Sequence, residues 1–252
     1  MERTSPTAAK GSTARKLMIS VICAFAYPVL VWYVWYRVVG YGSATLVLAQ
    51  IAGVVLAVAL VVSLRIGFRR AGLSAAKLPP ALAAGASAYA TAMGLAVLVQ
   101  SVGLADLQVM RPQYRLDAFL SSWGLTAFGE ELLFAGVIFT LVRQLLEHRP
   151  GENRRAWLAV PVVAMLFALW HLPGYTAVGY TDGALIGRLG LNLVSWLVFG
   201  TIYLLSGNLW LVVIAHASTD YGITPLITNE PLFGLIFMAV LVLAAWRTKA
   251  AG

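Results

Sequence analysis

The sequence has little charge, a single cysteine and only three histidines. Charged residues make up 11% of its 252 residues, hydrophobic residues make up 60%, and the mean hydropathy is +0.83. Because so few charges cannot cover a water-facing surface, the composition argues against a soluble domain. Cys23 stands alone, which excludes an intrachain disulfide and leaves the redox compartment open.

The net charge of +8 does not indicate nucleic acid as a partner. The Lys and Arg residues form short clusters between apolar runs, without the interleaved aromatic side chains that read bases. We interpret them as loop charges that set membrane orientation and contact anionic lipid headgroups. Membrane lipids are therefore predicted partners, and nucleic acid is not.

Long apolar runs dominate the rest of the chain. About 20 helical residues cross a bilayer core of about 30 Å, and several runs reach that length. We predict an all-α fold, a polytopic membrane helical bundle of about eight transmembrane helices. The predicted spans are Leu17 to Tyr36, Ser43 to Leu64, Ala81 to Val102, Ala118 to Val142, Ala156 to Leu172, Leu189 to Ser206, Leu209 to Tyr221 and Pro231 to Trp246.

The charge distribution predicts the orientation of the chain. Residues 1–16 read as a polar, basic cytoplasmic tail, and residues 17–252 as one membrane-embedded domain whose first span is retained rather than cleaved. With the N-terminus inside, fourteen Lys and Arg residues fall in inner segments and four in outer ones. The four outer residues are Arg37, Arg111, Arg115 and Arg188. This bias predicts that both termini are cytoplasmic.

Small residues and prolines predict local features of the helices. Pro28 should kink the first span, and Pro173 with Gly174 should end the fifth helix just after His171. A ridge of alanines at four-residue spacing should allow close helix packing in the third span. These are Ala84, Ala88, Ala92 and Ala96.

Three residues with carboxyl groups lie inside predicted spans, where a charged side chain has a high free-energy cost. Each of Glu130, Glu131 and Asp220 costs about 2.5 to 3.5 kcal/mol at a helix centre if it is left unpaired. Either polar neighbours satisfy these groups in a sealed core, or they line a wet cavity that performs chemistry.

The two glutamates are adjacent in the sequence, so their side chains cannot both point at the same atom. Adjacent helical residues point about 100° apart. We assign one of them to a reacting centre as a general base and the other to its support. Gly129 and Gly136 flank the pair and should permit close backbone approach.

Two of the three histidines also lie in spans. Phe167 and His171 are four residues apart and share a helix face, so the ring can wall a pocket beneath the imidazole. His216 and Asp220 repeat this spacing, which lets the carboxylate orient the imidazole or share its proton. His148 lies in a basic loop and reads as a solvated surface residue.

Together, these five groups predict a functional cavity. The polar residues Asn192, Ser195 and Asn208 fit either that cavity or hydrogen bonds between helices. Ser218 and Thr219 do not stand in the sequence setting of a nucleophilic serine.

These residues resemble the CAAX protease and bacteriocin-processing family, intramembrane proteases also called the CPBP or Abi family. The matching marks are Glu130-Glu131, the pair Phe167 and His171, and the pair His216 and Asp220, in that order on separate spans. The resemblance covers roughly residues 119 to 222, and we place a protease-like core at about 118-222. Two positions depart from the family pattern: Ala135 stands where an arginine is usual, and Asp220 where asparagine is more common.

The resemblance implies an intramembrane endopeptidase of a bacterial cytoplasmic membrane. Its substrate would be a membrane-associated protein or peptide, prenylated or of bacteriocin type. Our hypothesis has Glu130, helped by His171, activating a water, while His216 and Asp220 stabilise the oxyanion. An ionised Asp220 could not donate to an oxyanion, so it must be protonated or orient His216 instead.

Zinc is an open alternative for the same residues. A Zn²⁺ ion held by His171, His216 and Glu130 would make bound water a better nucleophile, although no His-Glu-x-x-His helix is present. A glutamate mechanism without metal fits equally well.

Two other classes of function compete with proteolysis. A noncatalytic member of the family could act as an immunity or partner protein, as Ala135 and Asp220 would allow. A proton-coupled transporter would use the same Glu and His residues as a relay, but it predicts symmetry between two halves that this sequence lacks.

Overall fold

The computed structural model describes residues 6–35, 38, 43–103, 108–109, 120–146, 153–220, 226–227 and 230–250. The predictions made for His148, Arg37, Arg111 and Arg115 lie outside these residues.

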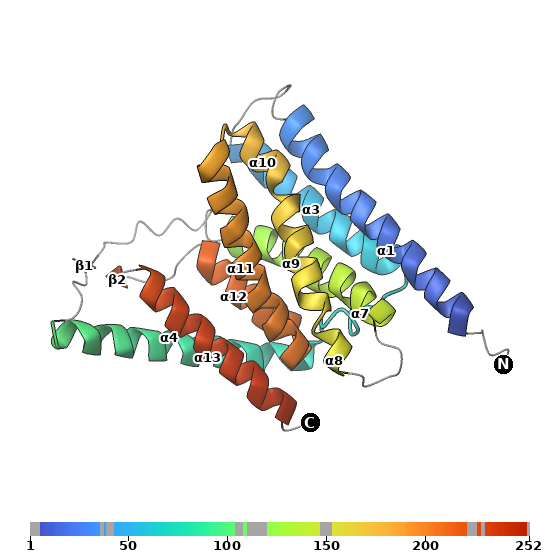
Figure 1. The fold of residues 1–252 in the computed structure, drawn as a ribbon. Helices are drawn as coiled ribbons and strands as arrows, with labels where there is room; N and C mark the ends of the chain where they lie inside the picture. The colour runs from blue at the N-terminus through green and yellow to red at the C-terminus, as the bar shows by residue number, and fades with distance from the viewer. Residues whose placement is uncertain are drawn as a thin grey trace.

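The described chain is a bundle of helices (Figure 1). The N-terminal part contains α1 (Pro6–Pro28), η1 (Val29–Trp35), α3 (Ser43–Ser63), η2 (Ala75–Lys77) and α4 (Leu78–Ser101). The middle contains η3 (Leu120–Ala127), α6 (Phe128–Glu131), η4 (Leu132–Phe139), α7 (Thr140–Leu146), α8 (Asn153–Ala156), α9 (Ala159–Trp170) and α10 (Leu172–Ala177). The C-terminal part contains α11 (Asp182–Ser206), α12 (Leu209–Asp220) and α13 (Glu230–Ala250). Two short strands, β1 (Gln108–Val109) and β2 (Leu226–Ile227), pair antiparallel.

The helices agree with the predicted membrane bundle. Six described helices are long and apolar enough to cross a membrane: Lys10–Trp32, Ala44–Ser63, Ala75–Ser101, Leu120–Leu146, Ala159–Ala177 and Asp182–Ser206. Two shorter apolar helices, Leu209–Asp220 and Phe233–Arg247, correspond to the last two predicted spans. A helix satisfies all of its own backbone hydrogen bonds, which lipid requires. The polytopic all-α fold is therefore confirmed.

The span Leu120–Leu146 is the central element of the bundle. Of its most apolar window, 72% is buried inside the protein, against 22% to 39% for the other five long spans. It contains the short α-helical turn α6 between two π-helical segments, η3 and η4. Because π-helical turns are rare and often occur at functional sites, this geometry marks the glutamate pair.

Glycines let neighbouring helices approach the central span. A Cβ atom at Gly129 would lie 3.0 Å from Val54 Cγ2 of α3, and one at Gly136 would lie 3.3 Å from the Cβ of Ala71. The predicted role of both glycines in close approach is confirmed.

The alanine ridge of α4 is mostly buried, and α4 packs against α13 and against α12, the helix that carries His216. Ala88, Ala92 and Ala96 are buried as predicted, while Ala84 is only partly buried. Gly85 belongs to the same stripe, and a Cβ there would lie 2.9 Å from Ile214 Cγ2 of α12.

Prolines mark two changes of helix geometry. α1 ends at Pro28 and continues as the π-helical η1, which agrees with the predicted irregularity at that residue. α9 ends at Trp170, and His171 is a turn residue before α10, whose first turn contains Pro173. Thus the predicted helix end is confirmed, but a short helix follows it because proline is tolerated in a first turn.

Candidate active site

The structure brings the five predicted site residues together from three elements. Glu130 and Glu131 lie on α6, His171 lies at the turn between α9 and α10, and His216 and Asp220 lie on α12. These segments are separated by up to 90 residues, counted from Glu130 to Asp220, yet their side chains form one cluster of ion-pair contacts.

Glu131 holds the imidazole of His216. Its Oε1 lies 2.8 Å from His216 Nδ1, and its side chain is fully buried. Because a carboxylate only accepts hydrogen bonds, this contact places a proton on Nδ1 when Glu131 is ionised. The ring is further fixed by Phe199, which stacks on it at a centroid distance of 5.0 Å. His216 Nε2 is consequently aimed at the other site residues.

Glu130 faces both imidazoles. Its Oε2 lies 3.7 Å from His171 Nε2 and 3.9 Å from His216 Nε2. This oxygen is buried and has no hydrogen-bond partner. An unsatisfied buried acceptor costs about 1 to 3 kcal/mol, or more when it is charged, so its position points to a role for a bound water or substrate.

The main chain fixes the tautomer of His171. His171 Nδ1 lies 2.9 Å from the carbonyl oxygen of Phe167, which can only accept, so Nδ1 carries the proton. The neutral ring then presents the lone pair of Nε2 to Glu130. Phe167 packs edge-on against the imidazole at a centroid distance of 4.6 Å, as the shared helix face predicts, but it does not line the cavity described below.

Asp220 lies at the edge of the cluster. Its Oδ2 is 3.5 Å from His216 Nε2, and about a third of its side chain is exposed. Glu131, at the opposite nitrogen, makes the shorter contact with His216. Orientation of this imidazole therefore comes chiefly from Glu131, and not from Asp220 as one of the two predicted roles would require.

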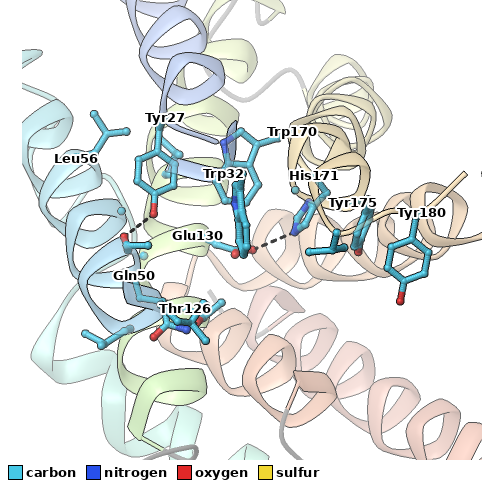
Figure 2. A pocket seen from close by; sticks show the side chains of 18 residues that line it. Tyr27, Trp32, Gln50, Leu56, Thr126, Glu130, Trp170, His171, Tyr175 and Tyr180 are labelled. Carbon is cyan, nitrogen blue, oxygen red and sulfur yellow. Dashed lines mark hydrogen bonds and ion pairs between the residues drawn. The ribbon is translucent and has the colours of Figure 1, made fainter. Parts of the chain in front are cut away.

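A cavity of about 350 Å³ opens beside Glu130 and His171. Figure 2 shows Glu130 between Gln50 and Thr126 on one side and His171 and Tyr175 on the other. Apolar and aromatic side chains make up most of the wall, including Tyr27, Trp32, Leu56, Trp170 and Tyr180. A peptide or lipid-like group in this cavity would reach Glu130.

The N-terminal helices contribute cavity residues that the sequence analysis did not single out. Gln50 of α3 lines the cavity and donates a hydrogen bond of 2.7 Å from Nε2 to Thr126 Oγ1. Its Oε1 is buried and has no partner. A signal was present in the sequence, because Gln50 is a carboxamide inside a run that is otherwise almost wholly apolar.

The other polar candidates divide between the cavity and helix packing. Asn192 donates to Tyr175 Oη at 2.9 Å and so supports the cavity wall, whereas Asn208 donates to the carbonyl oxygen of Lys77. Ser218 and Thr219 donate to main-chain carbonyls of their own helix. Neither hydroxyl is therefore placed as a nucleophile.

The predicted zinc ligands do not form a recognisable metal site. Within the described residues, no group of three or more His, Cys, Asp or Glu side chains is arranged to hold a metal ion. One donor nitrogen, His216 Nδ1, is already engaged by Glu131. Zinc stays a prediction.

Comparison with known proteins agrees with the geometry of the site. Residues 112–222 match a family model described as "Type II CAAX prenyl endopeptidase Rce1-like". Searches of curated proteins and of solved structures found no match. The matched range includes all five site residues. Residues 112–222 are therefore similar to the Rce1-like domain of the CAAX protease family.

Proposed function

We propose that this protein is an intramembrane endopeptidase that hydrolyses a peptide bond with a water activated by Glu130. The substrate is a membrane-associated protein or peptide, and the family points first to a prenylated CAAX-type C-terminus. The observation that carries the proposal concerns Glu130 Oε2, which is buried and has no hydrogen-bond partner. This oxygen faces two imidazole nitrogens beside a cavity.

Glu130 and His171 are suited to hold the attacking water. Their facing atoms, Oε2 and Nε2, are 3.7 Å apart, which is too long for a good direct hydrogen bond. A single water can donate one proton to each of these acceptors, which leaves its lone pair for the substrate carbonyl. As the oxygen–carbon bond forms, Glu130 takes the proton of the water. It then returns the proton to the amine as the carbon–nitrogen bond breaks.

His216 stabilises the oxyanion in this proposed mechanism. With Glu131 at Nδ1, a protonated His216 offers Nε2–H toward the site. The carboxylate of Glu131, which makes the shorter contact, would balance the charge of this imidazolium. Asp220 itself can donate to the oxyanion only in its protonated form.

Ala135 does not remove the support of the glutamate pair. It is fully buried on η4, where a family arginine would compete for space with the apolar core. Glu131 retains one partner, His216, although its Oε2 has none. The contact with His216 supports catalysis despite this departure from the family pattern.

A defined peptide tests the proposal. The full chain would be purified into lipid nanodiscs and given a fluorogenic peptide that carries a farnesylated cysteine followed by three residues. We expect cleavage by the wild type and a loss of at least about a thousandfold with Glu130→Gln, because the base is removed. Asp182→Asn, which removes an exposed carboxyl group at the start of α11, is the matched control and should cleave normally.

The same assay separates the remaining alternatives. Full activity after treatment with a chelator would contradict the zinc version. A folded wild type that binds the peptide but does not cleave it would favour the noncatalytic partner protein.

A further inference from the structure

The cavity contains a second unsatisfied acceptor besides the base. Of the described buried side-chain atoms without a hydrogen-bond partner, only Gln50 Oε1 and Glu130 Oε2 belong to cavity-lining residues. Two hydroxyl groups of the wall are engaged: Tyr27 Oη donates to the carbonyl oxygen of Ala49, and Tyr175 Oη accepts from Asn192. Gln50 therefore faces the cavity in the same unsatisfied condition as the proposed base.

Gln50 is held in place by the central span. Its Nε2 donates to Thr126 Oγ1 at 2.7 Å, and Thr126 precedes Glu130 by four residues on that span. One half of the carboxamide is thus anchored and the other half is free. An anchored amide loses little further rotamer freedom when it binds a ligand, which favours recognition.

An acceptor left empty in an apolar wall is costly unless a ligand fills it. A buried amide group without a hydrogen bond is destabilising relative to one that is paired. A substrate peptide supplies the missing donors, because every residue except proline carries a main-chain N–H. A prenyl chain or a lipid tail has no donor to offer.

We propose that Gln50 Oε1 accepts a hydrogen bond from a main-chain N–H of the bound substrate and so fixes the peptide register beside Glu130. This inference rests on the proposed function, and it places a substrate-binding residue outside the matched domain of residues 112–222. α3 is then a part of the substrate site as well as a packing helix.

The test measures peptide binding without cleavage. The full chain carrying Glu130→Gln is placed in nanodiscs, and its Kd for the farnesylated peptide is measured by fluorescence anisotropy. A series of analogues replaces each N–H except that of the scissile bond by an ester oxygen, which removes one donor at a time. Each peptide is measured with Gln50 present and with Gln50→Met, which keeps the length of the side chain but loses its polar atoms.

One ester should weaken binding about tenfold when Gln50 is present and less than twofold with Gln50→Met. The parent peptide should also bind Gln50→Met about tenfold more weakly. Gln100→Leu, at an exposed position near the end of α4, is the matched control and should behave like the unsubstituted background. Equal effects of every ester in both backgrounds would overturn the inference, as would a failure of the parent peptide to bind.

A purely structural role predicts a different result. If Gln50 only ties α3 to Thr126, then Thr126→Val and Gln50→Met lower the melting temperature alike, and no ester position distinguishes the two backgrounds. Cleavage by the wild type is measured separately. Cleavage without any dependence on Gln50 overturns this inference alone, and Gln50-dependent binding without cleavage overturns only the proposed function.

Discussion

The two adjacent glutamates have different surroundings and, in the proposed mechanism, different tasks. Glu131 contacts His216 at 2.8 Å, whereas Glu130 Oε2 has no hydrogen-bond partner and faces the cavity. In that mechanism Glu131 acts through His216 and is a positioning residue.

Glu131→Gln should lower kcat about 10- to 100-fold and leave KM nearly unchanged. Glutamine can still accept from His216 Nδ1, but it no longer balances the charge of an imidazolium. Steady-state kinetics on the farnesylated peptide provide the measurement. A rise in KM at constant kcat would show instead that Glu131 supports substrate binding.

Asp220→Asn should raise kcat about tenfold, because an amide N–H can donate to the oxyanion while an ionised carboxylate repels it. The substitution keeps the size of a side chain that lies 3.5 Å from His216 Nε2. Rates of the purified variant and the wild type are compared at neutral pH. A large loss of rate would instead mean that Asp220 is needed as a carboxylate.

Much of the residue cluster was predictable from the sequence, because charged and imidazole groups are energetically unfavourable in lipid. This cost singled out Glu130, Glu131, His171, His216 and Asp220, and the structure brings all five together. Gln50 was missed because its uncharged amide costs less and resembles an ordinary hydrogen bond between helices.

At the scale of elements, α4 supports the site through α12. Gly85→Val should destabilise the protein by about 1 to 3 kcal/mol, because its Cβ would lie 2.9 Å from Ile214 Cγ2. The melting temperature in detergent and the cleavage rate should fall together, since α12 carries His216. Adding Ile214→Ala should restore part of both. If the double variant has the same melting temperature and cleavage rate as Gly85→Val alone, the clash is not with Ile214.

The spans followed from apolar runs, but their irregularities did not. Eight predicted spans correspond to six long and two shorter apolar helices. The π-helical segments around α6 pack against α3 and α12, and no residue propensity foresees them. Proline, in contrast, is a local constraint, and it correctly marked the changes at Pro28 and near His171.

At the scale of the whole molecule, the cavity joins segments that are distant in the sequence. Its wall combines α1, η1 and α3 with the central span and α10. Sequence patterns identify helix faces but not which faces meet. Glu130 and His171 could therefore be assigned to a cavity from the sequence, while its aromatic wall could not.

Single-cysteine labelling tests the predicted orientation. In a Cys23→Ala background, cysteines at the exposed positions Lys10 and Arg247 should react with an impermeant maleimide only after the inner side is opened. A cysteine at Arg188, which is also exposed, should react from outside. Labelling of Lys10 and Arg247 from opposite sides would contradict the even number of spans.

The most direct test of the central claim compares the terminal peptides of the membrane proteome. Cells that express the wild type are compared by mass spectrometry with cells that express equal amounts of Glu130→Gln. If Glu130 activates water for proteolysis, new protein C-termini will appear only with the wild type, and they will identify the substrate. Identical termini in both samples, with the wild type folded in the membrane and substrate candidates present, would contradict the claim that this protein is a protease.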